Sequence, residues 1–297
     1  MEHTAFERLC SNQAGSPHNV FLDKTMNILA QRILNLAVGT SMMFLLAAGP
    51  SEILLAQDAS QQQLTKEEIF QKSKAAYAAL TSYSDEGKSV AVLNGLTITQ
   101  DFTTRLSRPN LYRIAWQDSY SSPDMPKAKP EVVWSAGNGD FLDMGFGEGA
   151  KKQKDQEMAL AGATGISGDA AGEIPAAFFN TKWANPFCCL AKGLIQQADE
   201  RVGDVDCYVF TGESSGNTRT IWIGKQDFFI RQIRNVTTAA GMKAAMERVA
   251  KVDPSAPDEP KTELTGSTSV ETHSNIVVNQ NLVEADFAPT KVSNQFY

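Results

Sequence analysis

The stretch that decides the fold is residues 206–236, which reads DCYVFTG (206–212), ESSGN (213–217), TRTIWIG (218–224), KQD (225–227) and FFIRQIRNV (228–236). The first, third and last pieces are rich in aromatic and β-branched residues, which favour strands. The two pieces between them are short and turn-like, so each can join two neighbouring strands only as a hairpin. The stretch therefore predicts three consecutive antiparallel strands.

A second β region lies upstream, where the hydrophobic period changes to two from residue 87 onward. In LTITQDFTTRLS (96–107) apolar residues alternate with polar ones, as in a half-buried strand. The turn Arg108-Pro109-Asn110 leads into LYRIAWQ (111–117), and Asn138-Gly139 lies between two short apolar runs. An Asn-Gly pair in that setting is a strong hairpin signal. The antiparallel sheet therefore extends on this side as well.

Helical patterns surround these strands. Thr65 and Glu68 form a capping box, and the residues after them repeat on one apolar face: Ile69, Phe70, Ala76, Tyr77 and Leu80. Residues 145–200 break the β pattern and predict a helical excursion across one face of the sheet, with a short helix near 155–160 and a helix over 175–194 split at Pro186.

The C-terminal part adds an inserted helix at 239–252 and a last strand at 263–276. With hairpin-length connectors, this order of elements predicts an α+β architecture, an antiparallel sheet with helices packed on one side. Nothing after residue 56 requires a second domain, so we expect residues 57–297 to form one.

Residues 1–56 are expected to be a signal or targeting segment. Ile33 to Ala48 carries no charge and follows Lys24 and Arg32, as in a secretory signal, and it is shorter than a membrane-spanning helix needs to be. Cleavage is expected after Ala56 or after Ala48, and the initiator is either Met1 or Met26. The alternative is an uncleaved membrane anchor. No cysteine follows the apolar core to take a lipid, so we expect a soluble periplasmic protein.

Charge and cysteine content narrow the classes of function. The net charge is -7, so the chain lacks the basic face that nucleic acid requires and the basic patch that an anionic membrane attracts. After the targeting segment, three cysteines remain: Cys188, Cys189 and Cys207. In an oxidising compartment Cys207 could pair with either of the other two, whereas adjacent cysteines rarely bridge each other. The alternative is three buried free thiols.

Short blocks of the sequence resemble the outer-membrane lipoprotein carrier and sorting superfamily (LolA-like), and most of all its branch of predicted periplasmic proteins of unknown function. The matching positions fall in a helix end, a turn, a strand pair and a final pattern: Tyr77, Leu80, Ser82 and Tyr83; Arg108, Pro109 and Asn110; Gly203, Cys207, Tyr208, Thr220, Trp222 and Ile223; Asn279, Leu282 and Phe287.

This resemblance implies an incomplete β-barrel, a strongly curved antiparallel sheet with helices packed as a lid on its concave face. It also implies a cavity for the acyl chains of a lipid or lipoprotein, and an arginine of the early strands that holds the lid through backbone hydrogen bonds. Arg105 lies in the corresponding block. The excursion at 145–200 and the helix at 239–252 exceed what a minimal carrier needs.

Aromatic residues are the candidate ligand-binding set. Those on predicted strands would face the cavity, and those in the excursion would cover it: Phe102, Trp116, Trp134, Phe141, Trp222 and Phe229; Phe178 and Phe179. Ordinary core packing explains any one of them equally well.

No catalytic or metal signature accompanies them. His273 is the one histidine after the targeting segment, so a catalytic triad or a site with several histidine ligands has nothing else to use. It lies on a predicted strand, where a histidine is most often either exposed or satisfied in its hydrogen bonds. We therefore expect a non-enzymatic monomer without a cofactor, which binds an apolar lipid or lipoprotein ligand. The alternative is an interaction or sensing module with a self-filled core and an envelope protein as its partner.

Overall fold

The computed structural model describes residues 64–123, 125, 128–145, 149–181, 186–187, 193–214, 216–252 and 265–289. The predicted targeting segment 1–56 lies outside the described residues, as do Cys188 and Cys189. Within the described part, none of the helices is both long and apolar enough to cross a membrane.

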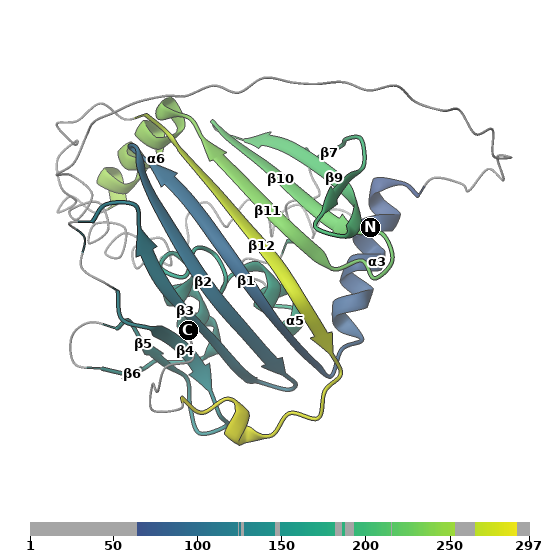
Figure 1. The fold of residues 1–297 in the computed structure, drawn as a ribbon, viewed down its shortest axis with the longest axis vertical. Helices are drawn as coiled ribbons and strands as arrows, with labels where there is room; N and C mark the ends of the chain where they lie inside the picture. Colours follow the sequence, from purple (N-terminus) through teal and green to yellow (C-terminus); the bar gives the residue numbers. More distant parts are fainter. Residues whose placement is uncertain are drawn as a thin grey trace, which may run out of the picture.

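Twelve strands form one antiparallel sheet, and the expected α+β architecture is confirmed (Figure 1). The order of the strands is β6-β5-β4-β3-β2-β1-β12-β11-β10-β9-β7, and β8 pairs with β9. The two ends of this order, β6 and β7, do not pair with each other, so the sheet is not closed into a barrel. The last strand, β12, lies at the centre, between β1 and β11.

The N-terminal half of the sheet runs from β1 to β6, and its strands are β1 (Ser82–Leu93), β2 (Leu96–Ser107), β3 (Leu111–Tyr120), β4 (Glu131–Ser135), β5 (Phe141–Asp143) and β6 (Lys151–Lys152). The C-terminal half consists of β7 (Ile195–Gln196), β8 (Glu200–Val202), β9 (Val205–Ser214), β10 (Asn217–Gly224), β11 (Ile230–Thr237) and β12 (Ser267–Val278). The predicted meander at 206–236 is confirmed as β9, β10 and β11.

The helices are α3 (Lys66–Ala78), α4 (Gln156–Thr164), α5 (Glu173–Phe179) and α6 (Ala239–Val252), with a short 3-10 turn η2 (Glu284–Asp286). The capping box before α3 is confirmed, because the Thr65 backbone N–H donates to Glu68 Oε2 over 2.8 Å. The inserted helix at 239–252 is confirmed as α6. The helix predicted over 175–194 is shorter: α5 begins at Glu173 and ends at Phe179, where Asn180 adopts a left-handed conformation, and residues 188–192 lie outside the described part.

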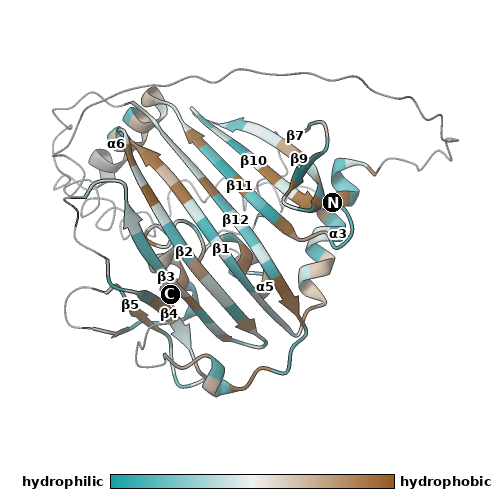
Figure 2. Cartoon of the chain, viewed as in Figure 1, coloured by the Kyte–Doolittle hydropathy of each residue, from teal (hydrophilic) through white to brown (hydrophobic). Residues whose placement is uncertain are grey.

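The predicted strand list was incomplete at the centre of the sheet. β1 pairs with β2 along its whole length and with β12 on the other side, yet no separate strand was predicted over 82–93, where a period of two was recognised only from residue 87 onward. Its inward side chains include Asp85, Gly87 and Ser89, which lack the apolar alternation by which strands are recognised. Elsewhere hydrophobic and hydrophilic residues alternate along the strands (Figure 2).

One face of the sheet, the inner face, carries the main core. Residues from β1, β2, β3, β10 and β11 pack there against α3 and against α4 and α5, so the excursion does lie across one face, as predicted. In Figure 1 α5 and its flanking loops lie behind the strands. We call residues 155–181, which contain α4, α5 and the loop between them, the cover segment.

Candidate functional site

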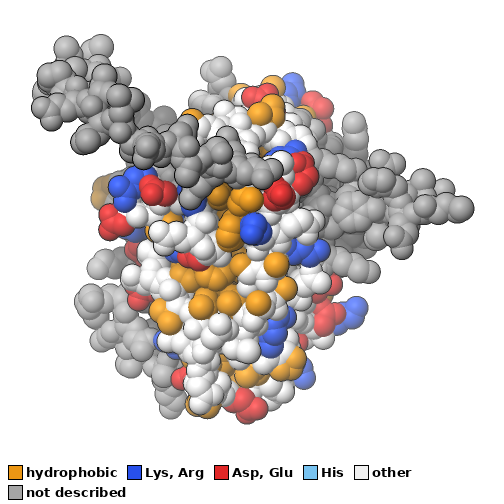
Figure 3. Space-filling view, turned by 90° about the vertical axis from the view of Figure 1, so that its right-hand side faces the viewer, with side chains coloured by type: hydrophobic (Ala, Val, Ile, Leu, Met, Phe, Trp, Pro, Cys, Tyr) orange, Lys and Arg blue, Asp and Glu red, His pale blue; other side chains and the backbone are white. Residues whose placement is uncertain are grey.

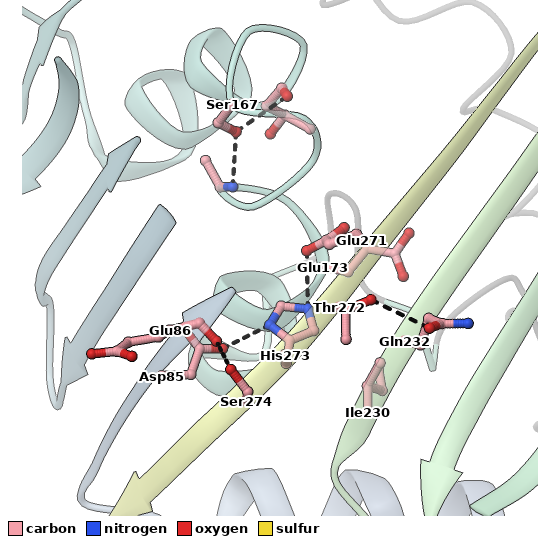
Figure 4. A network of polar contacts seen from close by, with 12 residues as sticks. Asp85, Glu86, Ser167, Glu173, Ile230, Gln232, Glu271, Thr272, His273 and Ser274 are labelled. Atoms are coloured by element: carbon pink, nitrogen blue, oxygen red, sulfur yellow. Dashed lines mark hydrogen bonds and ion pairs between the residues drawn. The ribbon is translucent and has the colours of Figure 1, made fainter. Parts of the chain in front are cut away.

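The centre of the inner face is polar rather than apolar. Asp85 and Ser89 point inward from β1, and both are buried. Their cross-strand neighbours on β2 and β12 are also buried polar residues: Thr104, Gln100 and Glu271. We call these five residues together with His273 the polar cluster; Figure 4 shows Asp85, Glu271 and His273 of this set.

His273 forms the middle of the polar cluster. Its Nδ1 lies 2.7 Å from Asp85 Oδ2, and its Nε2 lies 3.0 Å from Glu271 Oε1. Burial alone would lower the pKa of His273, but the attraction of Asp85 and the hydrogen bonds to Asp85 and Glu271 outweigh it and raise the pKa to about 10. The imidazole is therefore a cation at neutral pH, held between two carboxylates.

This geometry is unsuited to general-base catalysis. A base has to be unprotonated near the working pH, and an imidazole with a pKa of about 10 is not. Its second ring nitrogen faces the Glu271 carboxylate rather than a hydroxyl or thiol. Among the described residues no group of three or more His, Cys, Asp or Glu side chains could hold a metal ion.

A β-bulge turns His273 inward. Between the pairs Ser84–Val277 and Glu86–Ser274, β12 has two residues opposite the single residue Asp85. One of them, Asn275, has a left-handed backbone (φ 51°), which asparagine tolerates better than most residues. The extra residue reverses the alternation along the strand, so Ile276 and His273, three positions apart, share the inner face. His273 is thus a strand histidine with partners at both ring nitrogens, in line with the expectation, whereas the bulge was not predicted.

Polar contacts tie the cover segment to the cluster. Gln100 Nε2 donates to the carbonyl oxygen of Ile166 over 2.6 Å. A Cβ at Gly168 would lie 2.0 Å from Gln100 Oε1 and 2.6 Å from Ser89 Oγ, so the loop rests directly on these side chains. Arg219 on β10 forms an ion pair with Glu173 at the start of α5. The loop between α4 and α5 therefore closes over a charged part of the sheet.

Asp169 adds another carboxyl group under this loop. Burial and the neighbouring Glu271 carboxylate raise the pKa of Asp169 to about 6, although Arg219 opposes the shift. Burial lowers the pKa of Arg219, and Asp169 and Glu271 oppose that shift. The cover segment and the sheet thus share one electrostatic environment.

Several buried oxygen atoms of this region have no hydrogen-bond partner among the described residues. They are Asp85 Oδ1, Ser89 Oγ, Thr104 Oγ1, Glu173 Oε2 and Glu271 Oε2. Buried polar atoms in folded proteins are nearly always paired, so a group of unpaired ones is unusual. All five can accept a hydrogen bond, and one donor nearby, Arg219 Nε, is likewise without a partner among the described residues.

Arg108 fastens the other end of the cover segment. Its Nε donates to the carbonyl oxygen of Leu80 over 2.8 Å, and its Nη2 donates to those of Tyr77 over 3.3 Å and Phe178 over 2.5 Å. The guanidinium group also lies 4.6 Å from the centre of the Phe178 ring. Arg105, the candidate for such a role, instead donates to the carbonyl oxygen of Asp286. Arg108 therefore joins the ends of α3 and α5 to the turn between β2 and β3.

The predicted ligand-binding aromatics fall into two places. Those in the main core on the inner face, buried or partly buried, are Phe102, Trp116, Phe178, Phe179 and Phe229. The other three are not part of that core: Trp134 stacks on Phe141 at 5.3 Å between ring centres, and Trp222 packs with Cys207 and Val209. Five of the eight therefore lie in the main core: Phe102 and Trp116 on strands, Phe229 just before β11, and Phe178 and Phe179 in the cover segment itself.

Cys207 is a buried free thiol, and burial raises its pKa to about 11. Its two candidate disulfide partners lie outside the described residues. The choice between a disulfide and three buried free thiols therefore stays a prediction.

Comparison with known proteins finds similar structures but no similar sequence. No protein-family model matches the sequence, and no curated protein matches it. A DUF1329 family protein from Desulfovibrio piger is 11% identical over 75% of this chain and 96% of its own, with a TM-score of 0.32. MucB in the MucA/MucB complex of Pseudomonas aeruginosa is 9% identical over 76% of this chain and 61% of its own, with a TM-score of 0.40.

A third similar structure is that of a LolA superfamily protein from Nitrosomonas europaea, 12% identical over 76% of this chain and 99% of its own, with a TM-score of 0.30. Such low identities and TM-scores say nothing about a ligand or partner. What this chain does has to be inferred from its own side chains, above all the polar cluster and the cover segment that Arg108 fastens over it.

Proposed function

We propose that this chain is an exported, soluble protein that binds the acyl chains of a lipid or lipoprotein on the inner face of its sheet. The cover segment acts as the lid, and Arg108 is the contact that holds it closed. The hydrogen bond from Arg108 Nη2 to the carbonyl oxygen of Phe178 is the main observation in support of the proposal. The resemblance of the sequence blocks to lipoprotein carriers supports it further.

The composition of the cover segment suits a lid that opens. Its buried apolar side chains include three large ones, Leu160, Ile174 and Phe178, and six alanines: Ala159, Ala163, Ala170, Ala171, Ala176 and Ala177. An alanine buries far less apolar surface than a leucine, at about 0.8 kcal/mol per CH₂ group. Lifting such a segment costs less than lifting one built from large residues. Under it lie Phe102, Trp116 and Phe229, which an acyl chain could cover instead.

Native mass spectrometry of the purified protein, before and after solvent extraction, tests the proposal. We expect a co-purifying lipid before extraction and displacement of a fluorescent fatty-acid probe by added lipid afterwards. No co-purifying lipid together with no probe displacement would contradict lipid binding.

A matched pair of variants tests the role of Arg108. Arg108→Gln removes the contacts with the end of α5, so we expect the probe to enter faster in stopped-flow measurements. Arg105→Gln changes a nearby arginine, on β2, that contacts the Asp286 carbonyl and not α5. Equal entry rates in the two variants would show that Arg108 does not hold the lid.

The second candidate is an interaction module of the cell envelope. Edge strand β7 carries Ile195, which is 67% exposed, and hydrophobic side chains gather in the middle of the side of the molecule seen in Figure 3. Edge strands and exposed apolar patches are places where partner proteins bind. A cross-linking pull-down that recovers one envelope protein in stoichiometric amount, with no lipid bound, would favour this candidate.

A further inference from the structure

The cluster under the cover segment has more acidic than basic groups. Four carboxyl groups lie there, Asp85 and Glu271 from the sheet and Asp169 and Glu173 from the cover segment. Two cations, His273 and Arg219, balance them only in part. Buried carboxylates without a compensating positive charge are unfavourable in a protein interior. The region is therefore suited to receive one more cation.

Unpaired buried groups point into the same region. The Ser89 hydroxyl is 1% exposed and has no hydrogen-bond partner among the described residues, and it faces the loop at Gly168. Glu271 is 3% exposed, and its Oε2 is unpaired as well. The hydroxyl oxygen of Thr104, a residue that is 1% exposed, is a third buried oxygen without a hydrogen-bond partner among the described residues. These atoms can accept hydrogen bonds from an incoming group that carries several N–H donors.

The polar cluster also adjoins the apolar part of the inner face. Phe102 on β2 has its ring centre 5.5 Å from that of His273, and Trp116 lies directly opposite Phe102 on β3. A molecule on this face would thus meet aromatic rings at one end and carboxylates at the other. That is the pattern of an amphiphile with an apolar tail and a positively charged head.

We propose that the polar cluster, together with Asp169 and Glu173, binds the ammonium headgroup of an amphiphilic ligand whose tail lies on the aromatic part of the inner face. This rests on the proposed function and names the class of ligand for it. Glu271 and Asp169 supply the charge, and Ser89 and Thr104 accept hydrogen bonds from the ammonium group.

Three probes with the same twelve-carbon tail test the headgroup: dodecylamine, dodecanol and dodecanoate. Each is titrated, below its micelle concentration and at pH 7.5, against the full chain loaded with the uncharged dye N-phenyl-1-naphthylamine. We expect dodecylamine to bind at least about tenfold more tightly than dodecanoate, with dodecanol between them, because charges attract far more strongly in a protein interior than in water.

Variants of the acidic residues test whether these residues cause the preference for the amine over the alcohol. Glu271→Gln should reduce the ratio of amine to alcohol affinity by about tenfold, as expected for the loss of one buried charge. The control Glu213→Gln makes the same change of charge at an exposed position of β9 and should leave the ratio unchanged. Asp169→Asn is a second variant in case Glu271→Gln fails to fold, because asparagine keeps the left-handed backbone found there (φ 75°).

The outcomes separate the two proposals. If dodecylamine binds no more tightly than dodecanol, or if neither Glu271→Gln nor Asp169→Asn lowers the ratio, the ammonium site is wrong while apolar binding stands. If none of the three probes displaces the dye, the proposed function itself fails and the ammonium site with it.

Discussion

The imidazole of His273 and the carboxylate of Asp85 are 188 residues apart in the chain and 2.7 Å apart in the fold. They come from β12 and β1, the last strand and the first, which pair at the centre of the sheet. Both side chains are completely buried. The contact therefore joins the two ends of the domain through a charged pair in its interior.

The stability of the fold should depend on the proton of His273. Its pKa in the folded state, about 10, lies above the ordinary value of 6.5, so folding favours the protonated ring. The stabilisation is complete below about pH 6.5 and is lost as the pH rises through about 10. We expect the free energy of unfolding in urea to fall by up to about 2–3 kcal/mol between pH 6.5 and 8.5.

That interval separates His273 from the buried thiol and phenol groups whose pKa values are also raised, those of Cys207, Tyr77, Tyr83 and Tyr112. Cys207 contributes a loss of the same sign, but only above about pH 9, where its thiol would ionise in the unfolded chain. His273→Gln should remove most of the slope between pH 6.5 and 8.5, and Cys207→Ser should leave it in place. A wild-type stability that stays constant over this interval would contradict the charged assignment of His273.

The ion pair between Arg219 and Glu173 should behave as a buried pair. Arg219→Met leaves the Glu173 carboxylate unpaired and should cost about 3–5 kcal/mol, whereas the double variant Arg219→Met/Glu173→Met should recover much of that loss. The exposed pair Lys88–Asp101 is the control, where Lys88→Met should cost less than about 1 kcal/mol. Urea unfolding of the four proteins measures the difference. Similar costs at the two pairs would mean that Glu173 is well solvated.

The sequence predicted the elements whose signals are local. The capping box at Thr65 and Glu68 located α3, and the Asn138-Gly139 pair located the hairpin of β4 and β5. The pattern of Met and Ala at 239–252 located α6. In each case a few neighbouring residues determine the structure, so their order in the chain suffices to predict it.

The polar cluster could not be predicted in that way. The inward positions 85, 87 and 89 of β1 carry no apolar side chain, because they are Asp85, Gly87 and Ser89, whose partners on β12 are about 180–190 residues away. The direction of His273 depends on the bulge at Asn275, which reverses the strand's alternation without leaving a hydrophobic signal. The alternation Asp85-x-Gly87-x-Ser89 is the one feature of the sequence that indicates the polar cluster. It can be interpreted in that way only when β1 is known to lie at the centre of the sheet.

The bulge should depend on the backbone of Asn275. Asn275→Val places a β-branched residue at φ 51° and should destabilise the protein by about 1–2 kcal/mol. Asn275→Gly should be close to neutral, because glycine adopts this conformation freely and loses only an exposed hydrogen bond to Glu86. Thermal unfolding at pH 7 compares the two. An equal effect of valine and glycine would show that the side chain of Asn275, and not its backbone, maintains the bulge.

Gly87 makes room for the ring of Phe102, and the two should be coupled energetically. A Cβ at Gly87 would lie 2.0 Å from Phe102 Cζ, and the ring, 2% exposed, is enclosed by the core and cannot swing away. Gly87→Ala should therefore cost about 1–3 kcal/mol, as overpacking does. In Phe102→Leu the shorter side chain leaves space, so the same alanine should cost clearly less there. A double-mutant cycle of urea unfolding free energies measures this coupling. If Gly87→Ala costs as much in Phe102→Leu as in the wild type, the Phe102 ring can move aside in Gly87→Ala, despite its contact with His273 at 5.5 Å between ring centres.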